Sequence, residues 1–227
     1  MPELPSSRRV PKSRLLLLVL LLASAAWMFA EKQPLPKAFH AKTYPAQETH
    51  SEEKVSIAVD PYDMPDKAAV FVVNYKASGL MPMHFIISND GDQAVSLVDM
   101  QVELILFDRS KIPPATVDDL YRRLSKQTRR GDEPARNPLP VPLPRQKVKS
   151  SVSPEAQAEI EAMQFRARAV EAHALQSGFL IFDVQAVANP LAGAHLYVHG
   201  LRDQDGKELF YFEIPLEKYL TYRPGHP

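Results

Sequence analysis

Hydrophobic and polar residues alternate along much of the chain from Lys54 onward. A period of two is typical of β-strands that bury one face, whereas helices repeat every three to four residues. Val55, Ile57 and Val59 show the pattern most clearly, and 68–73 is a continuous apolar run that also predicts a strand. Further strands are predicted at 83–87, 95–97, 102–106, 179–184, 196–198 and 209–214.

Turn residues separate two pairs of these strands. Asn89-Asp90-Gly91-Asp92 tolerates positive φ angles and predicts a hairpin into the strand at 95–97. Asp205-Gly206 predicts a tight hairpin turn into 209–214, where Phe210, Phe212 and Ile214 would share one face. Asp203 to Gly206 is similar to the start of a calcium loop, but Ile214 stands where the closing glutamate is needed, which favours the turn.

Two segments have helical spacing instead. The first is predicted at 117–127, with Thr116 as its N-cap and acidic residues in its first turn. The second begins at Ser153-Pro154 and extends to about Met163. Whether residues 165–174 continue this helix is open, although alternation of apolar and arginine positions favours a strand. A short closing helical turn is predicted at 216–222.

The N-terminus predicts export. Four basic residues between Arg8 and Arg14 precede the apolar run Leu15–Ala30, and basic flanks are retained in the cytoplasm. Ala23-Ser24-Ala25 offers a signal-peptidase site, whereas Trp27-Met28-Phe29 prolongs the apolar stretch as in an uncleaved anchor. We therefore expect an extracytoplasmic chain, either in the cell membrane as a single-pass protein with its N-terminus inside, or periplasmic or secreted after cleavage.

These patterns divide the chain into segments. Residues 1–30 form a signal peptide or signal anchor, and 31–53 hold three prolines without hydrophobic period, which predicts an extended tether. A β-sandwich domain is predicted at 54–222, with a helical, proline-rich insertion at 109–152, and a tail at 223–227.

Composition excludes several kinds of chemistry. The chain has 227 residues and no cysteine, so it has no disulfide, thiolate zinc site, cysteine nucleophile or lipidated cysteine. Its 27 basic and 27 acidic residues balance, so there is no overall charge that would attract nucleic acid. No cofactor and no metal is expected.

Two strand motifs carry a resemblance. Phe85-Ile86-Ile87-Ser88-Asn89-Asp90-Gly91-Asp92 and Gly178-Phe179-Leu180-Ile181-Phe182-Asp183-Val184 resemble motifs of bacterial extracytoplasmic immunoglobulin-like domains, many of them of unknown function. The resemblance covers roughly 54–108 and 165–214. It implies a mainly β fold, an antiparallel two-layer immunoglobulin-like sandwich, and it brings no catalytic residues.

The insertion holds the candidate binding surface. Its helix and the residues after it are rich in cations that could contact anionic lipid headgroups, phosphate-bearing envelope polymers or an acidic protein. The alternative is an ordinary solvated helix face. Nucleic acid is not expected, because the block lacks aromatic residues for stacking and lies in the wrong compartment. The candidate binding residues are Arg122, Arg123, Lys126, Arg129 and Arg130.

Two other features have simpler interpretations. Pro138 to Pro144 alternates proline with Leu or Val, which predicts a polyproline II segment that serves as a stiff spacer or docks on a partner. His195 and His199 have the spacing of metal ligands on a helix, but on a strand they lie roughly 13 Å apart and cannot share an ion.

Together these observations predict a non-enzymatic binding or assembly module of the cell envelope. The chain has no G-x-S-x-G motif, and Ser177-Gly178 is interpreted as the start of a strand. An envelope hydrolase whose residues meet only in the folded chain remains the alternative, because such sites are recognised by geometry. A structural subunit of a larger assembly is a third possibility.

Overall fold

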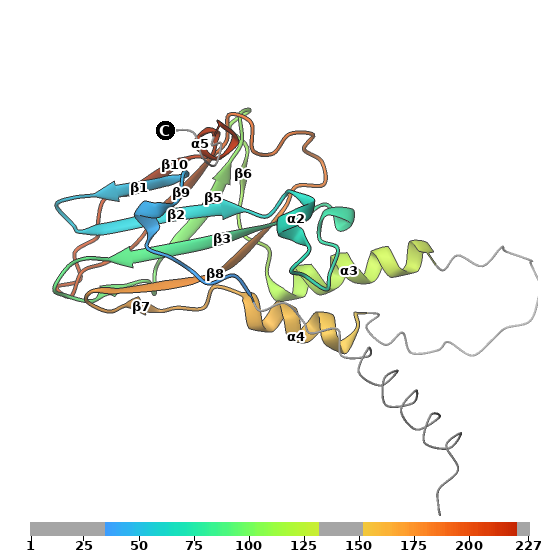
Figure 1. Cartoon of the computed structure of the whole chain (residues 1–227), viewed down its shortest axis with the longest axis horizontal. Helices are drawn as coiled ribbons and strands as arrows, with labels where there is room; N and C mark the ends of the chain where they lie inside the picture. Colours follow the sequence, from blue (N-terminus) through green and yellow to red (C-terminus); the bar gives the residue numbers. More distant parts are fainter. Residues whose placement is uncertain (1–34, 132–151, 222–227) are drawn as a thin grey trace, which may run out of the picture. The chain divides into compact units, whose positions relative to one another are not determined.

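The computed structural model describes residues 35–131 and 152–221, with the backbone alone for 126–131. These residues form a mainly β fold with antiparallel sheets and a few helices (Figure 1). The strands are β1 (Gln47–His50), β2 (Val55–Pro61), β3 (Leu80–Asn89), β4 (Val95–Ser96), β5 (Gln101–Ile105), β6 (Lys111–Ile112), β7 (Ala169–Val170), β8 (Ala174–Asp183), β9 (His195–His199) and β10 (Phe212–Pro215). The helices are α2 (Pro65–Ala68), α3 (Val117–Gly131), α4 (Pro154–Met163) and α5 (Glu217–Thr221), with 3-10 turns η1 (Ala41–Thr43) and η2 (Lys76–Ser78).

Two four-stranded sheets make up most of the domain. The first has the strand order β1-β2-β3-β8, and the second has the order β10-β9-β5-β6. Every pair of neighbouring strands in them is antiparallel. The short strands β4 and β7 form a separate pair.

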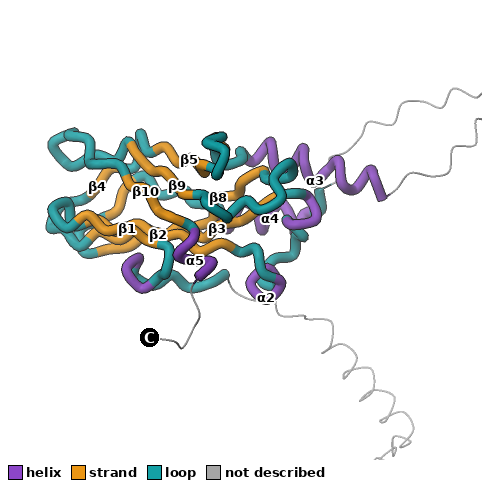
Figure 2. Tube along the Cα trace, turned by 90° about the horizontal axis from the view of Figure 1, so that it is seen from above, coloured by secondary structure: helices purple, strands orange, loops and turns teal. Residues whose placement is uncertain are grey.

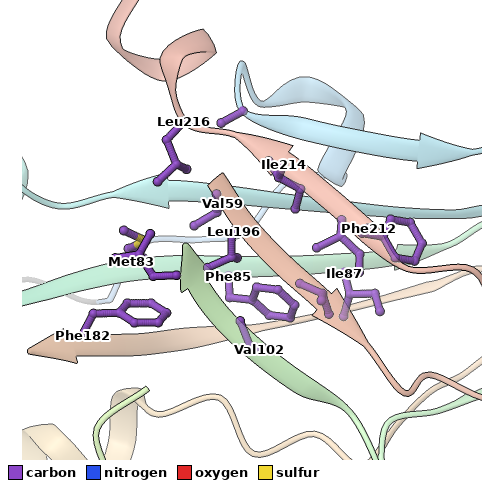
Figure 3. Close-up of a cluster of buried hydrophobic side chains, with 14 of the residues drawn as sticks. Val59, Met83, Phe85, Ile87, Val102, Phe182, Leu196, Phe212, Ile214 and Leu216 are labelled. Atoms are coloured by element: carbon purple, nitrogen blue, oxygen red, sulfur yellow. The ribbon is translucent and has the colours of Figure 1, made fainter. Parts of the chain in front are cut away.

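The inner faces of the two sheets share one hydrophobic core (Figure 3). Phe85 and Ile87 of β3 point toward Leu196 of β9 and Phe212 of β10, and all four are fully buried. Alternate residues of these strands supply the core, as the period of two requires. These strands, together with β2, β5 and β8, exclude water from the space between the sheets.

The outer face of the first sheet is covered as well. Leu120 of α3 and Ile160 and Met163 of α4 pack with Phe179 and Ile181 of β8 in a second cluster. Viewed from above, α3 and α4 lie at one end of the sheets (Figure 2). Farther along β3, Ala41 packs on Ile86, and β3 is buried at all ten of its positions.

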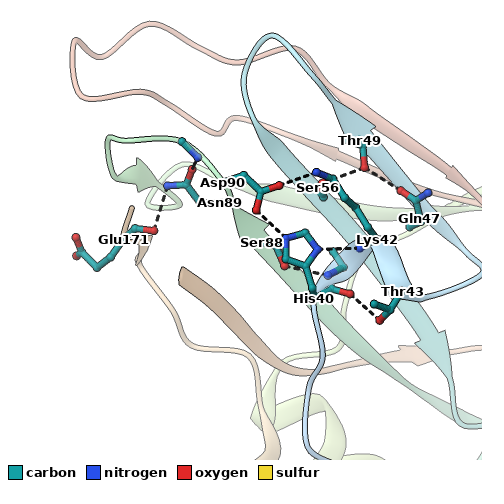
Figure 4. Close-up of polar contacts among 12 residues, drawn as sticks. His40, Lys42, Thr43, Gln47, Thr49, Ser56, Ser88, Asn89, Asp90 and Glu171 are labelled. Carbon is teal, nitrogen blue, oxygen red and sulfur yellow. Dashed lines mark hydrogen bonds and ion pairs between the residues drawn. The ribbon is translucent and has the colours of Figure 1, made fainter. Parts of the chain in front are cut away.

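Residues 35–50 are part of this fold, which corrects the predicted tether. β1 pairs with β2, and the backbone N–H of Ala41 donates to Ser88 Oγ at 2.9 Å. His40 and Lys42 both bind the Asp90 carboxylate, at 2.8 and 2.6 Å (Figure 4). These two hydrogen bonds lower the pKa of Asp90. The segment is held mainly by polar contacts and by small buried alanines, which leave no hydrophobic period in the sequence.

The edge between the two sheets is joined through His50 of β1. Its ring stacks on Phe212 of β10 at 3.9 Å, and its nitrogens lie 3.3 Å from Glu48 Oε1 and 3.0 Å from Glu53 Oε2. The same two carboxylates accept backbone N–H groups near β10, from Glu213 and from Phe210. β1 therefore ties the first sheet to the edge of the second.

The strand predicted at 68–73 is wrong. Pro65 starts the short helix α2, and the residues after Ala68 form turns and bends rather than a ladder. The backbone N–H groups of Val72 and Val73 donate to the carboxylate of Glu159 on α4, at 2.6 and 3.1 Å. The carboxylate of Glu159 thus accepts backbone N–H groups that a neighbouring strand would otherwise bind.

The hairpin predicted at 89–92 is also wrong. The side-chain amide of Asn89 donates to Gln93 O, Val170 O and Glu171 O, which directs the chain toward β7 (Figure 4). β4 accordingly pairs with β7, at Val95↔Val170, and not with β3.

Other predicted elements are confirmed. α3, α4 and α5 all form, and the N-cap hydroxyls of Thr116 and Ser153 accept the N–H groups of Asp119 and Ala156, each at 3.2 Å. β9 and β10 form the predicted hairpin, but Phe210 is 64% exposed and does not share the buried face. α4 ends at Met163, so the helical alternative for 165–174 is wrong, while the strand occupies only β7 and the start of β8.

Gly178 lies inside β8, not at its start, and allows close packing. A Cβ there would lie 2.5 Å from the backbone Cα of Phe165. We therefore expect Gly178→Ala to lower the free energy of unfolding by about 1–3 kcal/mol, the usual effect of overpacking. Urea unfolding monitored by circular dichroism measures this change. Ser177→Ala, on the exposed side of the same strand, serves as the control, and equal stability of both variants would contradict the expectation.

Candidate functional site

The predicted basic surface lies on α3, whose first turns are fixed by the fold. Thr116 Oγ1 donates to Asp119 Oδ2 at 2.7 Å and accepts its N–H, which holds the start of the helix. Leu120 and Leu124 are buried in the cluster with α4 and β8. This packing determines which side of α3 faces the domain and which side faces away.

The five candidate residues lie along the side of α3 that turns away from Leu120 and Leu124, with Arg123 at its edge, where it reaches Asp183. At about 100° per residue, their positions span an arc of roughly 120° that is opposite Leu120 and Leu124. The structure describes only the backbone at Lys126, Arg129 and Arg130, so their place on the helix is known and their contacts are outside the described part. The sequence alone could predict this arrangement once the helix was identified.

Arg122 and Arg123 differ in their surroundings. Arg122 forms an ion pair with Asp119, one turn earlier in α3, and its side chain is 67% exposed. Arg123 binds Asp183 at the end of β8 and also Gln185, and its side chain is only 28% exposed. Arg123 therefore fastens α3 to the first sheet, whereas Arg122 belongs to the outward surface.

Two open clefts flank Arg123. One, of about 730 Å³, lies between the β5–β6 turn and the segment after β8, and the other, of about 380 Å³, lies beside the start of α3. Both contain the Arg123–Asp183 pair, and Phe107 at the edge of the larger cleft is 83% exposed. These clefts contain paired charges with apolar walls, and the sequence did not indicate them because their residues come from four distant segments.

A group of titratable residues lies between β2, β3, α2 and α5. Lys67 Nζ donates to Asp60 Oδ1 at 2.5 Å and lies 4.6 Å from the ring centre of Tyr219, whose hydroxyl donates to Asp63. Burial raises the pKa of Asp60, although the hydrogen bond from Lys67 lowers it. Burial also raises the pKa of Tyr219. The charges are mutually satisfied, which makes this group a structural connection between α2 and the sheet.

The two predicted strand histidines lie on β9, with buried Leu196 and Val198 on the opposite face. His195 lies 3.2 Å from Glu213 on the neighbouring strand. Within residues 35–131 and 152–221, no group of three metal-ligating side chains is close enough to hold an ion. Asp203 accepts the N–H groups of Asp205 and Lys207, so the predicted hairpin turn is confirmed.

Several predicted features lie outside the described residues. They are the apolar segment 1–30, the proline-rich segment 138–144 and the tail 223–227. In the part of the chain that the structure covers, every helix is too short or too polar to cross a bilayer.

Comparison with known proteins gives no further assignment. No family model matches the chain, and no curated protein and no solved structure is significantly similar to it. Function is therefore inferred from the residues of the chain and from their arrangement.

Proposed function

We propose that the chain is a non-enzymatic, extracytoplasmic binding or assembly module of the cell envelope, and that α3 binds a phosphate-bearing anionic component. The observation that supports it most is the position of the basic residues on the side of α3 opposite Leu120 and Leu124. Cations on that side can meet a ligand without disturbing the core.

The charge along α3 also supports binding of an anion. Asp118 and Asp119 are confined to the first turn, where they suit the helix dipole. From Leu124 to Gly131 the helix has three cations and no acidic residue. Arginine is well suited to phosphate because its planar guanidinium can donate two parallel hydrogen bonds.

The immunoglobulin-like character of the domain is part of this proposal. Sandwiches of that kind place strands A-B-E on one sheet and G-F-C on the other. The observed orders β2-β3-β8 and β10-β9-β5 are consistent with that arrangement. Such domains commonly serve as rigid supports for surfaces that bind partners, which suits a helix attached to one end.

The test compares two variants with the same change of charge. The first replaces Lys126, Arg129 and Arg130 with glutamine, and the second replaces Lys76, Lys207 and Lys218, which are exposed elsewhere. At about 1 kcal/mol for each cation, we expect the first variant to bind roughly 100-fold more weakly.

The measurement is calorimetric titration of the full chain, in neutral detergent, with inorganic polyphosphate as the probe. Retention of both variants on envelope fractions gives a second readout. We expect the control variant to bind as the unchanged chain does. Equal affinity of the two variants for polyphosphate would show that α3 is not the contact surface.

A further inference from the structure

We propose that α3 binds anionic lipid headgroups of the membrane in which the chain itself is anchored, so that the domain lies directly on that membrane. The inference rests on the proposed function, because it uses the same basic side of α3. It goes further in naming the ligand, which is a lipid phosphate of the anchoring membrane and not a polymer or a distant protein.

The first step is the length of the connection. The predicted apolar segment ends at Ala30, and the fold begins at Leu35 instead of at residue 54. Five peptide links span at most about 18 Å. An anchor at Leu15–Ala30 therefore holds the domain within about that distance of the bilayer, where a long tether would have let it move away.

The second step is that lengthening this short connection would cost free energy, because the first residues of the fold are held in place. Ala41 is fully buried against Ala58 and Ile86, and its N–H binds Ser88. Lys42 and His40 hold Asp90 at 2.6 and 2.8 Å. Releasing residues 35–46 would break these contacts and expose one face of the first sheet.

The third step is the chemistry where the described chain begins. Leu35 is 39% exposed and Phe39 is 62% exposed, and Lys37 between them is exposed as well. Apolar side chains next to a lysine are suited to the boundary between headgroups and acyl chains. This region can therefore lie against a membrane without further change.

The fourth step is the relation of this region to α3. In the projection of Figure 1 the blue segment that begins at Leu35 starts below the middle of the sheets, where it is drawn over the start of α4, and runs toward β1. At the end of the domain that carries α3, Leu80 at the start of β3 lies next to the cleft of Arg122 and Arg123.

The opposite end of the domain has no comparable surplus of cations. The β9–β10 turn contains three acidic residues, Asp203, Asp205 and Glu208, and two basic ones, Arg202 and Lys207, which gives it a net charge of −1. It lies near Glu53 of the β1–β2 turn, because Phe210 N–H donates to that carboxylate at 2.7 Å. An anionic membrane would attract α3 and not this turn, which orients the domain.

The experiment measures the distance of each end from the lipid. Because the chain has no cysteine, Thr128→Cys on α3 and Gln204→Cys in the β9–β10 turn each give a single labelling site. The full chain with a donor dye is reconstituted into vesicles that contain an acceptor on a headgroup. The vesicles consist of phosphatidylcholine alone or of equal parts of phosphatidylcholine and phosphatidylglycerol.

We expect strong energy transfer from residue 128 and weak transfer from residue 204 in the anionic vesicles. The difference in energy transfer between the two labels should shrink in vesicles of phosphatidylcholine alone. It should also shrink in the variant that has glutamine at Lys126, Arg129 and Arg130. A flexible Gly-Ser spacer between Lys32 and Gln33 should remove the transfer from residue 128 in neutral vesicles but not in anionic ones.

Two results would overturn the inference separately from the proposed function. Equal transfer from both labels, with polyphosphate binding still dependent on α3, would show that the basic side does not face the anchoring membrane. The second result is the intact mass of protein extracted from membranes. A mass that corresponds to a chain beginning after Ala25 would show that the N-terminal segment is cleaved and that there is no anchor. If polyphosphate binding does not depend on α3, the proposed function fails instead.

Discussion

Replacing Glu159 with alanine should lower the free energy of unfolding by about 3 kcal/mol, because it leaves one buried hydroxyl and two half-buried backbone N–H groups without an acceptor. Glu159 is 2% exposed and accepts hydrogen bonds from Val72 N–H, Val73 N–H and the Tyr75 hydroxyl. Burial, together with this carboxylate, raises the pKa of Tyr75. Glu159 thus fastens residues 69–75 onto α4.

Two further variants separate this role from a general effect on α4. Glu159→Gln keeps one acceptor oxygen and should cost about half as much. Glu161→Ala removes an exposed carboxylate from the same helix, and it should change stability by no more than about 0.5 kcal/mol. Urea unfolding measures all three, and trypsin should cut faster after Lys67 or Lys76 in Glu159→Ala alone. Equal unfolding midpoints for the alanine variants would contradict this role.

The second large effect is a loss of stability in mild acid caused by His84. Its ring lies 5.0 Å from that of Phe179 and is 3% exposed. Burial, and then the charge of Lys67, lowers the pKa of His84 to about 4. The unfolded chain has the ordinary value of about 6.5, so it binds the proton more tightly than the folded chain does.

The sign of the effect follows from this order. The contribution of neutral His84 to the free energy of unfolding is complete above about pH 6.5. It is lost as the pH falls toward 4, by about 3 kcal/mol in all. The raised pKa of Asp60 acts in the opposite direction, because protonation of that carboxyl favours the folded state. The lowered pKa values of Asp90 and Asp92 cause losses only below their usual range, in stronger acid.

The measurement compares urea unfolding at pH 7 and pH 4.5 within each variant, so that any general cost of a substitution cancels. His84→Phe keeps an aromatic ring beside Phe179 and His84→Gln does not, but both should reduce the difference between the two pH values. His173→Asn, at an exposed histidine, should keep the difference. An unchanged difference in both His84 variants would contradict the assignment.

Local patterns predicted the elements that carry their own signals. The period of two identified β2, β3, β5 and β9, and the caps Thr116 and Ser153 identified α3 and α4. The elements that were predicted wrongly are determined by contacts between residues that are distant in the sequence. The run at 68–73 is apolar but meets a carboxylate from α4, and β1 is held by neighbours that no periodicity reports.

The candidate site was predictable to a similar degree. The basic side of α3 follows from helical spacing alone, so all five positions could be placed on one arc. The separate role of Arg123 could not be predicted, because its partner Asp183 lies at the end of β8, far along the chain. Only the fold shows that Arg123 is paired with a distant acid, whereas the ion pair of Arg122 with Asp119 lies within α3 itself.

The position of β3 has a consequence for how the chain acquires its structure. β3 pairs with β2, which precedes it closely, but also with β8, whose first residue is Ala174. A chain that is exported N-terminus first presents a hairpin of β2 and β3 well before its last neighbour has emerged. During that interval both faces of β3 and one of its edges are open to other chains. The domain therefore reaches its folded state late, and a chaperone that shields β3 until β8 has emerged should raise its yield.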